Sequence, residues 1–363
     1  MVVAAGVFLS WLWWRGGQNV SPVPLVIAPT NPPSPRGFDR QPAPLIVTSG
    51  PTRTNQTPPP LILPPKPKPE ALPPLHPEMR TASTVLEAQI AMLSAGISSG
   101  PIDGSLGSQT RAAVRAFQLQ QHLLPDGELN EATKQRMYLS GPTFTTYQVS
   151  SNDLSRLMTI GTTWIEKSEQ EALEYESVLE LVAEKYLASQ TMIRSLNLGV
   201  NWTNIAAGTV LKVPNAVRPL QRERAAVIKI QLGAKSLQAF GTSSNLLAHF
   251  PCSIAQKVEK RPVGQLSVAK VARNPNYVFD PAVYPESPEA QAIGRKLVIP
   301  PGPNNPVGTA WIGLDRPGYG IHGTPKPEQV GRTESHGCFR LANWNAEFLF
   351  DLVWVGLPVV VEP

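Results

Sequence analysis

The chain has 363 residues, of which 42% are hydrophobic, so it is long enough for two or three domains with cores of their own. Its formal charge is +5 at pH 7 and its pI is 9.2, yet no block of lysine and arginine indicates a nucleic-acid-binding surface. A mild positive charge suits an anionic polymer as a partner, although solvated surface charge accounts for most of it. We therefore expect no nucleic-acid partner.

Residues 1–15 contain an apolar run, residues 2–14, that ends in tryptophans just before Arg15. A membrane-spanning helix needs about 20 residues, so the run is short for one and fits the apolar part of an export signal. No basic residue precedes it, no small-residue cleavage site follows it, and its tryptophans are typical of a membrane interface. We expect an export signal that stays as a membrane anchor. A cleaved signal peptide comes second, and a cytoplasmic protein with an apolar start comes third.

Residues 16–82 are predicted to be a linker, because about a third of the residues from Ser21 to Glu78 are proline. Proline fixes φ and removes a backbone donor, so the segment cannot form a helix or a central strand. We expect a disordered tether with polyproline II character. The alternative is a proline-rich ligand for a partner domain.

From residue 83 to residue 140 the apolar spacing becomes helical. A first helix has one apolar face, formed by Leu86, Ile90 and Leu93. A second helix begins after Ser108-Gln-Thr110, and Asn130 can cap a short third helix. Two Asp-Gly turns, at Asp103 and Asp126, use glycine for positive φ and aspartate for a local hydrogen bond.

This segment is similar to the three-helix peptidoglycan-binding domain found in many wall enzymes. The resemblance implies peptidoglycan as a partner, and a three-helix bundle without a ligand is the alternative. The residues that carry it are Gln89, Gly96, Asp103, Gly104, Gly107, Thr110, Ala113, Phe117, Gln118, Asp126, Gly127 and Thr133.

Residues 145–215 resemble a lysin motif, a small β-α-α-β module that binds N-acetylglucosamine chains. The resemblance is carried by Tyr147–Val149, Val178–Tyr186, Met192–Asn197 and Ile205–Pro214. Two departures leave sugar binding open. Asn152-Asp153 replaces the usual Gly-Asp, and an insertion from Leu154 to Glu174 separates the first strand from the first helix.

From residue 224 onward, strand patterns dominate. Ala226–Ile230 and Ser236–Phe240 alternate as the two strands of a hairpin do. No glycine cluster lies between a strand and a helix, so there is no nucleotide-binding fingerprint.

Near the C-terminus, Ile321-His-Gly-Thr324 precedes Ser335-His-Gly-Cys-Phe-Arg340. A thiol is a weak nucleophile until a base takes its proton, and imidazole serves as that base. Glycine beside the thiol lets a substrate carbonyl approach backbone N–H groups that stabilise an oxyanion. The pattern predicts acyl transfer through a thioester, and a structural cysteine with two surface histidines is the alternative. The other cysteine, Cys252, is expected to be a small buried residue, with Cys338 free rather than in a disulfide.

These residues resemble the signature of the YkuD-type L,D-transpeptidase catalytic domain, from Gly318 through Leu341. The flanking stretches Ile299–Gly308 and Val353–Val361 extend the resemblance to about residues 224–363, and Arg261-Pro-Val-Gly264 departs from the family's Thr-Pro-x-Gly. The resemblance implies a β-sandwich-like domain. The chain as a whole is then a multidomain α+β protein: a three-helix domain at 83–140, a βααβ module at 145–215 and a mainly-β catalytic domain at 224–363.

The resemblance also implies roles for individual residues. Cys338 is the nucleophile, His322 its general base and later acid, and the Gly323 carbonyl orients the imidazole. His336, Gly337 and Cys338 supply oxyanion donors, and Ser335 supports the loop. Arg340 binds a substrate carboxylate or forms a structural salt bridge, while Thr324 and Tyr319 line the cleft or serve packing. No cofactor or metal is expected, since the two histidines lack a convincing third ligand.

The implied reaction releases D-alanine from a tetrapeptide stem and joins two stems at their third residues. Water as acceptor gives an L,D-carboxypeptidase, and a lipoprotein lysine gives protein anchoring. A non-catalytic peptidoglycan-binding scaffold is the alternative from a different class.

Overall fold

The computed structural model describes residues 79–220, 223–333, 335 and 337–363, which all belong to one compact unit, Ala71–Pro363. The predicted signal or anchor at residues 1–15 and the linker as far as residue 78 lie outside the described residues. Within the described ranges, no helix has the length and apolar character needed to cross a membrane.

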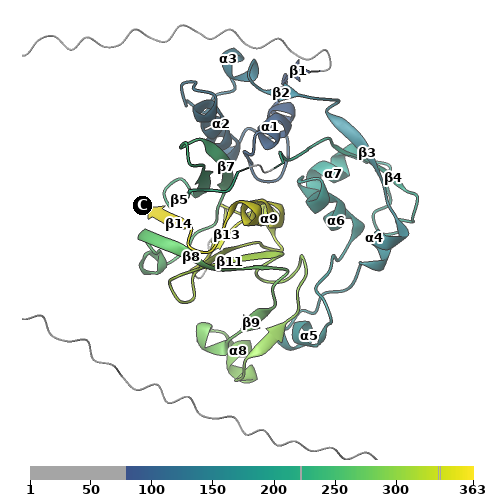
Figure 1. Cartoon of the computed structure of the whole chain (residues 1–363). Coiled ribbons are helices and arrows are strands. Elements are labelled where there is room, and N and C mark those ends of the chain that lie inside the picture. Colours follow the sequence, from purple (N-terminus) through teal and green to yellow (C-terminus); the bar gives the residue numbers. More distant parts are fainter. Residues whose placement is uncertain (1–78, 221–222, 334, 336) are drawn as a thin grey trace, which may run out of the picture. The chain divides into compact units, whose positions relative to one another are not determined.

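The first module contains the three predicted helices (Figure 1), which are α1 (Val85–Ser94), α2 (Ser108–Gln120) and α3 (Glu131–Lys134). Asn130 caps α3, because its side chain accepts a hydrogen bond of 2.9 Å from the Thr133 N–H. A two-stranded ladder that the sequence did not predict closes the module, and it pairs β1 (Arg80–Thr81) with β2 (Tyr138–Leu139).

The two Asp-Gly turns of this module are built in the same way around a buried glutamine. The Gln89 amide donates to Asp103 at 2.9 Å and accepts from the Gly104 N–H at 2.8 Å. The Gln118 amide donates to Asp126 at 2.6 Å and accepts from the following glycine. Both glutamines are buried. These residues of the peptidoglycan-binding pattern therefore hold the turns of the module together.

The second module pairs β3 (Phe144–Gln148) with β4 (Val210–Pro214) in antiparallel fashion. Between them lie the two expected helices, α6 (Val178–Lys185) and α7 (Gln190–Leu196). The segment before α6 adds α4 (Ser151–Ser155) and α5 (Trp164–Glu169). The order of elements is the predicted one with two helices added, while the lysin-motif identity stays a prediction.

The remaining part is mainly β, as predicted, and contains the predicted hairpin β5–β6. Its strands form one continuous sheet rather than two facing sheets, in the order β13-β12-β11-β8-β14-β5-β6-β7. The bounds are β5 Val227–Gln231, β6 Ser236–Phe240, β7 Leu246–Pro251, β8 Gly264–Arg273, β11 Ala310–Leu314, β12 Gly320–His322, β13 Phe339–Arg340 and β14 Pro358–Glu362. The helix α9 (Asn343–Leu352) packs against β11 and β12 and shares a hydrophobic core with the sheet.

A hairpin of β9 (Tyr277–Phe279) and β10 (Leu297–Ile299), with α8 (Pro288–Ile293) between its strands, lies apart from the main sheet. Figure 1 shows it beside α5 of the second module. Trp164 stacks on Phe279 with ring centroids 4.4 Å apart. The segment that interrupts the predicted lysin-motif pattern therefore packs on the mainly-β part of the chain.

The first module covers an edge of the main sheet. Ile97 forms a parallel bridge with His249 of the edge strand β7, and the Ser98 N–H donates to the His249 carbonyl at 2.8 Å. Gly96 has φ +82°, and a Cβ there would lie 2.4 Å from the Leu247 carbonyl oxygen. The loop thus satisfies part of a strand edge that would otherwise be open to pairing with another chain.

Candidate active site

His322 is the last residue of β12, and Cys338 immediately precedes β13, the parallel neighbour of β12. In the β12–β13 pair, Ile321 lies opposite Phe339 and His322 opposite Arg340. Cys338 lies just outside β13, and its Sγ is 3.5 Å from the carbonyl oxygen of Gly318, just before β12. The β12–β13 pairing therefore brings the thiol and the imidazole to the same strand pair.

The His322 imidazole is held from two directions. Its Nδ1 lies 2.7 Å from the Gly323 carbonyl oxygen. A carbonyl only accepts, so Nδ1 carries the proton and Nε2 is left with a free lone pair. Trp311 of β11 stacks on the ring with centroids 5.5 Å apart, and a Cβ on Gly320 would lie 2.6 Å from the same indole. The stack therefore requires glycine at position 320.

The sequence analysis assigned no role to Trp311. The available signal was its place on a strand preceding the histidine, but the pairing of Trp311 with His322 is a matter of register between two strands, which local pattern does not give.

Burial sets the protonation of both groups. It lowers the pKa of His322 to about 4, with the Gly323 hydrogen bond opposing and the Arg340 charge adding to the shift. Burial also raises the pKa of the Cys338 thiol, against the opposing effects of the Gly320 N–H and the Arg340 charge. The resting pair at neutral pH is thus a neutral thiol beside a neutral imidazole.

The two cysteines differ in access. Both are free, Cys338 is partly exposed and Cys252 is fully buried, as expected. The Cys338 Sγ lies 3.5 Å from the Gly318 carbonyl oxygen. Burial raises the pKa of Cys252 far above its usual range. Cys338 is therefore the thiol that a substrate can reach.

The loop before Cys338 is closed by Ser335. Its hydroxyl donates to the Cys338 carbonyl, and it accepts a 3.3 Å hydrogen bond from the Gly337 N–H. The Gly337 N–H that was predicted to bind an oxyanion is thus directed to Ser335 here. His336 lies outside the described residues.

The remaining predicted residues surround this pair. The partly buried Arg340 donates to Thr333 at 3.2 Å. Thr324 is buried, and its hydroxyl accepts from the Lys326 N–H at 3.3 Å, so it holds the turn after the histidine. Tyr319 is partly buried against the core of the sheet.

The loop between His322 and Cys338 is attached to both helical modules. From the first module, the Gln109 amide donates to the Val330 carbonyl at 2.5 Å. From the second, the Gln190 N–H donates to the Glu328 carboxylate at 2.8 Å. Sequence reasoning missed both contacts, because no local pattern connects residues this far apart in the chain.

The described residues contain no group of three or more histidine, cysteine, aspartate or glutamate side chains placed to hold a metal ion.

Two family models match this chain. Residues 225–361 match the L,D-transpeptidase catalytic domain (YkuD), and residues 81–137 match the putative peptidoglycan binding domain. Both domain identities predicted from the sequence are thereby confirmed.

Individual relatives of this chain are also named L,D-transpeptidases. The chain is 38% identical over 106 residues to the putative L,D-transpeptidase YqjB of Bacillus subtilis, covering 28% of this chain and 51% of that protein. It is 29% identical over 184 residues to the probable L,D-transpeptidase YbiS of Escherichia coli, covering 50% and 58%. The chain thus spans only about half the length of these curated relatives. The crystal structure of an L,D-transpeptidase from Xylanimonas cellulosilytica aligns with 15% identity and a TM-score of 0.33, covering 80% of this chain and 100% of that one.

Proposed function

We propose that this chain, which carries a YkuD-type L,D-transpeptidase catalytic domain, is a cysteine L,D-transpeptidase that acts on the stem peptides of peptidoglycan. The observation that carries the proposal is the placement of His322 at the end of β12 and of Cys338 just before its parallel partner β13, with Nδ1 of the imidazole bound to Gly323. This leaves Nε2 as the atom that can accept the thiol proton.

In the first step, the Cys338 sulfur attacks the carbonyl carbon of the third residue of a tetrapeptide stem. The thiol proton passes to Nε2 of His322, and the carbonyl electron pair moves to oxygen. The backbone N–H of Cys338, with His336, would stabilise this oxyanion, and the Gly337 N–H would join them only after it leaves the Ser335 hydroxyl. Losing one such donor costs roughly 3 kcal/mol in the barrier. As the intermediate collapses, the C–N bond breaks, and D-alanine leaves with the proton from His322.

In the second step, the amine of another stem attacks the thioester carbon. His322 takes a proton from this amine and returns it to the departing sulfur. A new amide forms between the third residues of two stems, and Cys338 is regenerated as a thiol. No atom changes its oxidation state, so the cycle needs no redox partner.

The neutral resting pair fits this sequence. A neutral imidazole is ready to accept a proton, and a neutral thiol gives it up only as the C–S bond forms. The charge of Arg340 near both groups suits the carboxylate of a stem peptide.

We assign the protein to the cell envelope, because its proposed substrate is the wall polymer and its first module matches a putative peptidoglycan binding domain. Peptidoglycan is its proposed partner through both domains. The membrane anchor predicted at residues 2–14 stays a prediction.

Three other outcomes remain as alternatives: an L,D-carboxypeptidase that uses water as acceptor, an enzyme that anchors a lipoprotein lysine, and a binding scaffold without turnover. Product analysis separates them. The full chain is incubated with a disaccharide-tetrapeptide, with and without a lysine-bearing lipoprotein peptide, and the products are resolved by liquid chromatography and mass spectrometry.

A dimer linked through the third residues, with free D-alanine, supports the transpeptidase. Tripeptide alone indicates the carboxypeptidase, and a conjugate of tripeptide and lysine indicates the anchoring enzyme. Absence of all products, with no acylation of Cys338 by a carbapenem, leaves the scaffold.

A further inference from the structure

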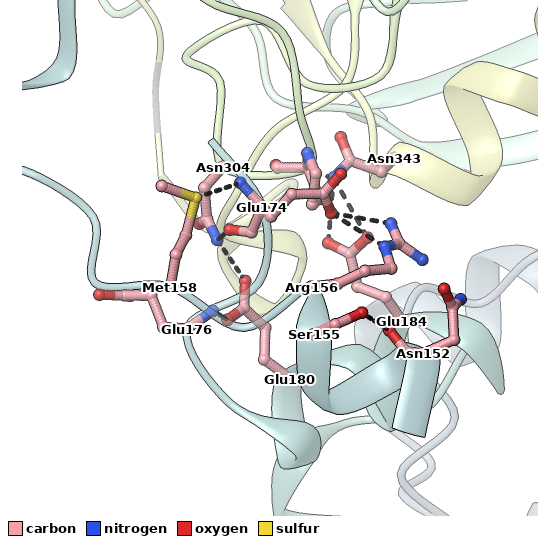
Figure 2. Close-up of polar contacts among 11 residues, drawn as sticks. Asn152, Ser155, Arg156, Met158, Glu174, Glu176, Glu180, Glu184, Asn304 and Asn343 are labelled. Carbon is pink, nitrogen blue, oxygen red and sulfur yellow. Dashed lines mark hydrogen bonds and ion pairs between the residues drawn. The ribbon is translucent and has the colours of Figure 1, made fainter. Parts of the chain in front are cut away.

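A buried carboxyl group of the second module contacts the start of α9. Glu184, on α6, faces Asn343, the first residue of α9 (Figure 2). The Asn343 amide nitrogen lies 3.0 and 3.3 Å from the two carboxyl oxygens and 3.1 Å from the Pro303 carbonyl oxygen. Both side chains are buried, so neither is free to exchange these partners for bulk water.

The other end of the Asn343 side chain, its Oδ1, packs against the backbone of Gly308 and Gly323 and has no hydrogen-bond partner among the described residues. A Cβ on Gly308 would lie 2.0 Å from Asn343 Oδ1, and a Cβ on Gly323 would lie 2.3 Å from it. Both positions therefore need glycine for the amide to fit. The Gly323 carbonyl is also the group that accepts from Nδ1 of His322. Glu184, Asn343, Gly323 and His322 thus form an unbroken series of contacts.

The second module also forms hydrogen bonds with the loop before β11. Figure 2 shows Asn304 between Glu174 and Glu180. Its side chain donates to the Glu174 carbonyl at 2.8 Å and to the Glu180 carboxylate at 2.7 Å. A Cβ on Gly302 would lie 2.1 Å from the Leu173 carbonyl oxygen. The backbone that Asn343 contacts at Pro303 is therefore itself fixed by the second module.

We propose that Glu184 is a positioning residue for proton transfer: it holds the Asn343 amide against the Gly323 peptide and thereby fixes the direction of the His322 imidazole. The inference rests on the proposed function, in which His322 takes the thiol proton. It assigns the second module a part in catalysis that does not require it to bind sugar. A misplaced imidazole meets the thiol in poor geometry, and proton transfer depends steeply on that geometry.

Three variants separate the polar contact from packing. Glu184→Gln keeps an oxygen that accepts from Asn343. Glu184→Leu fills a similar volume and accepts nothing, and Asn343→Leu removes the other partner of the same contact. Glu176→Gln is the matched control, since Glu176 is an exposed residue just before the same helix. Thermal melting reports whether each protein is folded.

The readout is the rate of alkylation of Cys338 by iodoacetamide at pH 7, followed by intact mass in the full-length protein. This reagent needs no stem peptide. We expect Glu184→Leu and Asn343→Leu to slow alkylation by about threefold to tenfold, the range expected for one lost hydrogen bond. Glu184→Gln and Glu176→Gln should stay within about twofold of the wild type.

The double variant with His322→Ala is decisive. If Glu184 acts through the imidazole, Glu184→Leu adds no further loss once His322 is gone. An equal loss in both backgrounds, or no loss in a folded Glu184→Leu protein, would overturn the inference. So would the failure of both leucine variants to fold, since the contact would then serve stability alone. A different result is that Glu184→Leu slows alkylation only when His322 is present, while the wild type does not turn over tetrapeptide. That result would keep the inference and reject the proposed function.

Discussion

Trp311 lies nearly parallel to the imidazole of His322, with 21° between the ring planes, and pairs with it across β11 and β12. The indole is part of what keeps water from the histidine, which is 6% exposed. Because burial is the largest cause of the low pKa of His322, the indole contributes to the protonation state of the base.

Replacing Trp311 by leucine should therefore let water reach the imidazole and raise the pKa of His322 from about 4 toward its ordinary value of 6.5. We expect slower acylation of Cys338 below about pH 6, where more of the base is then protonated. An NMR titration of His322 measures the shift, with Trp354→Leu as the control at a tryptophan distant in sequence. An unchanged His322 pKa would show that the indole does not control its solvation.

Gly320→Ala should disturb the stacking of Trp311 on His322. The new Cβ would lie 2.6 Å from the Trp311 ring, so the indole must move. Overpacking of this kind costs about 1–3 kcal/mol of unfolding free energy. Denaturant unfolding of Gly320→Ala and of Gly199→Ala, where nothing lies within 4 Å of the new Cβ, makes the comparison. Equal stability of the two variants would count against the close packing.

The stability of the protein should depend on pH through Glu184. Burial raises the pKa of its carboxyl to about 8 in the folded protein, against 4.5 ordinarily. Between these values the folded protein keeps a proton that the unfolded chain has released, so stability falls as the pH rises through this window. Burial raises the pKa of Glu180 as well, which acts in the same direction.

Glu184→Gln cannot ionise and should lose this dependence. We expect its Tm, relative to that of the wild type, to rise by several degrees between pH 5 and pH 8. Calorimetry at both values checks this, with Glu176→Gln as the control. A constant difference between variant and wild type would show that Glu184 does not hold a proton in the folded state.

Gln109 should matter for turnover without matching any catalytic pattern. Gln109→Ala removes the amide that donates to Val330, in the loop between the two catalytic residues. We expect kcat to fall severalfold, as for the loss of one hydrogen bond, while sedimentation with isolated peptidoglycan is unchanged. Gln135→Ala, at an exposed position of the same module, should change neither. If Gln109→Ala stopped sedimenting with peptidoglycan but kept its kcat, Gln109 would serve peptidoglycan binding and not turnover.

The proposed catalytic pair has a local signal: the cysteine, its flanking glycine and serine, and the upstream histidine lie within a short stretch that one strand pairing brings together. The helices of the first module were predictable from apolar spacing and caps such as Asn130. In the second module the resemblance predicted α6 and α7, whereas α4 and α5 were not predicted. The joining of β5 to β14 in parallel, which makes one sheet from strands at opposite ends of the domain, has no local signal.

The contacts between modules were not predictable for the same reason. Asn343 and Glu184 are 159 residues apart in the chain, and each reads as an ordinary polar residue on an amphipathic helix. The segment from Leu154 to Glu174 was recognised only as a departure from a known pattern. In the structure its Trp164 and Leu173 pack on the catalytic domain, so the departure marks the interface.

The most direct test of the account is the intact mass of the full-length protein during incubation with a disaccharide-tetrapeptide, for the wild type and for Cys338→Ala. We predict an adduct on the wild type alone, equal to the donor minus D-alanine and mapped by peptide sequencing to Cys338. Turnover by Cys338→Ala, or an adduct mapped to Cys252, would contradict the account.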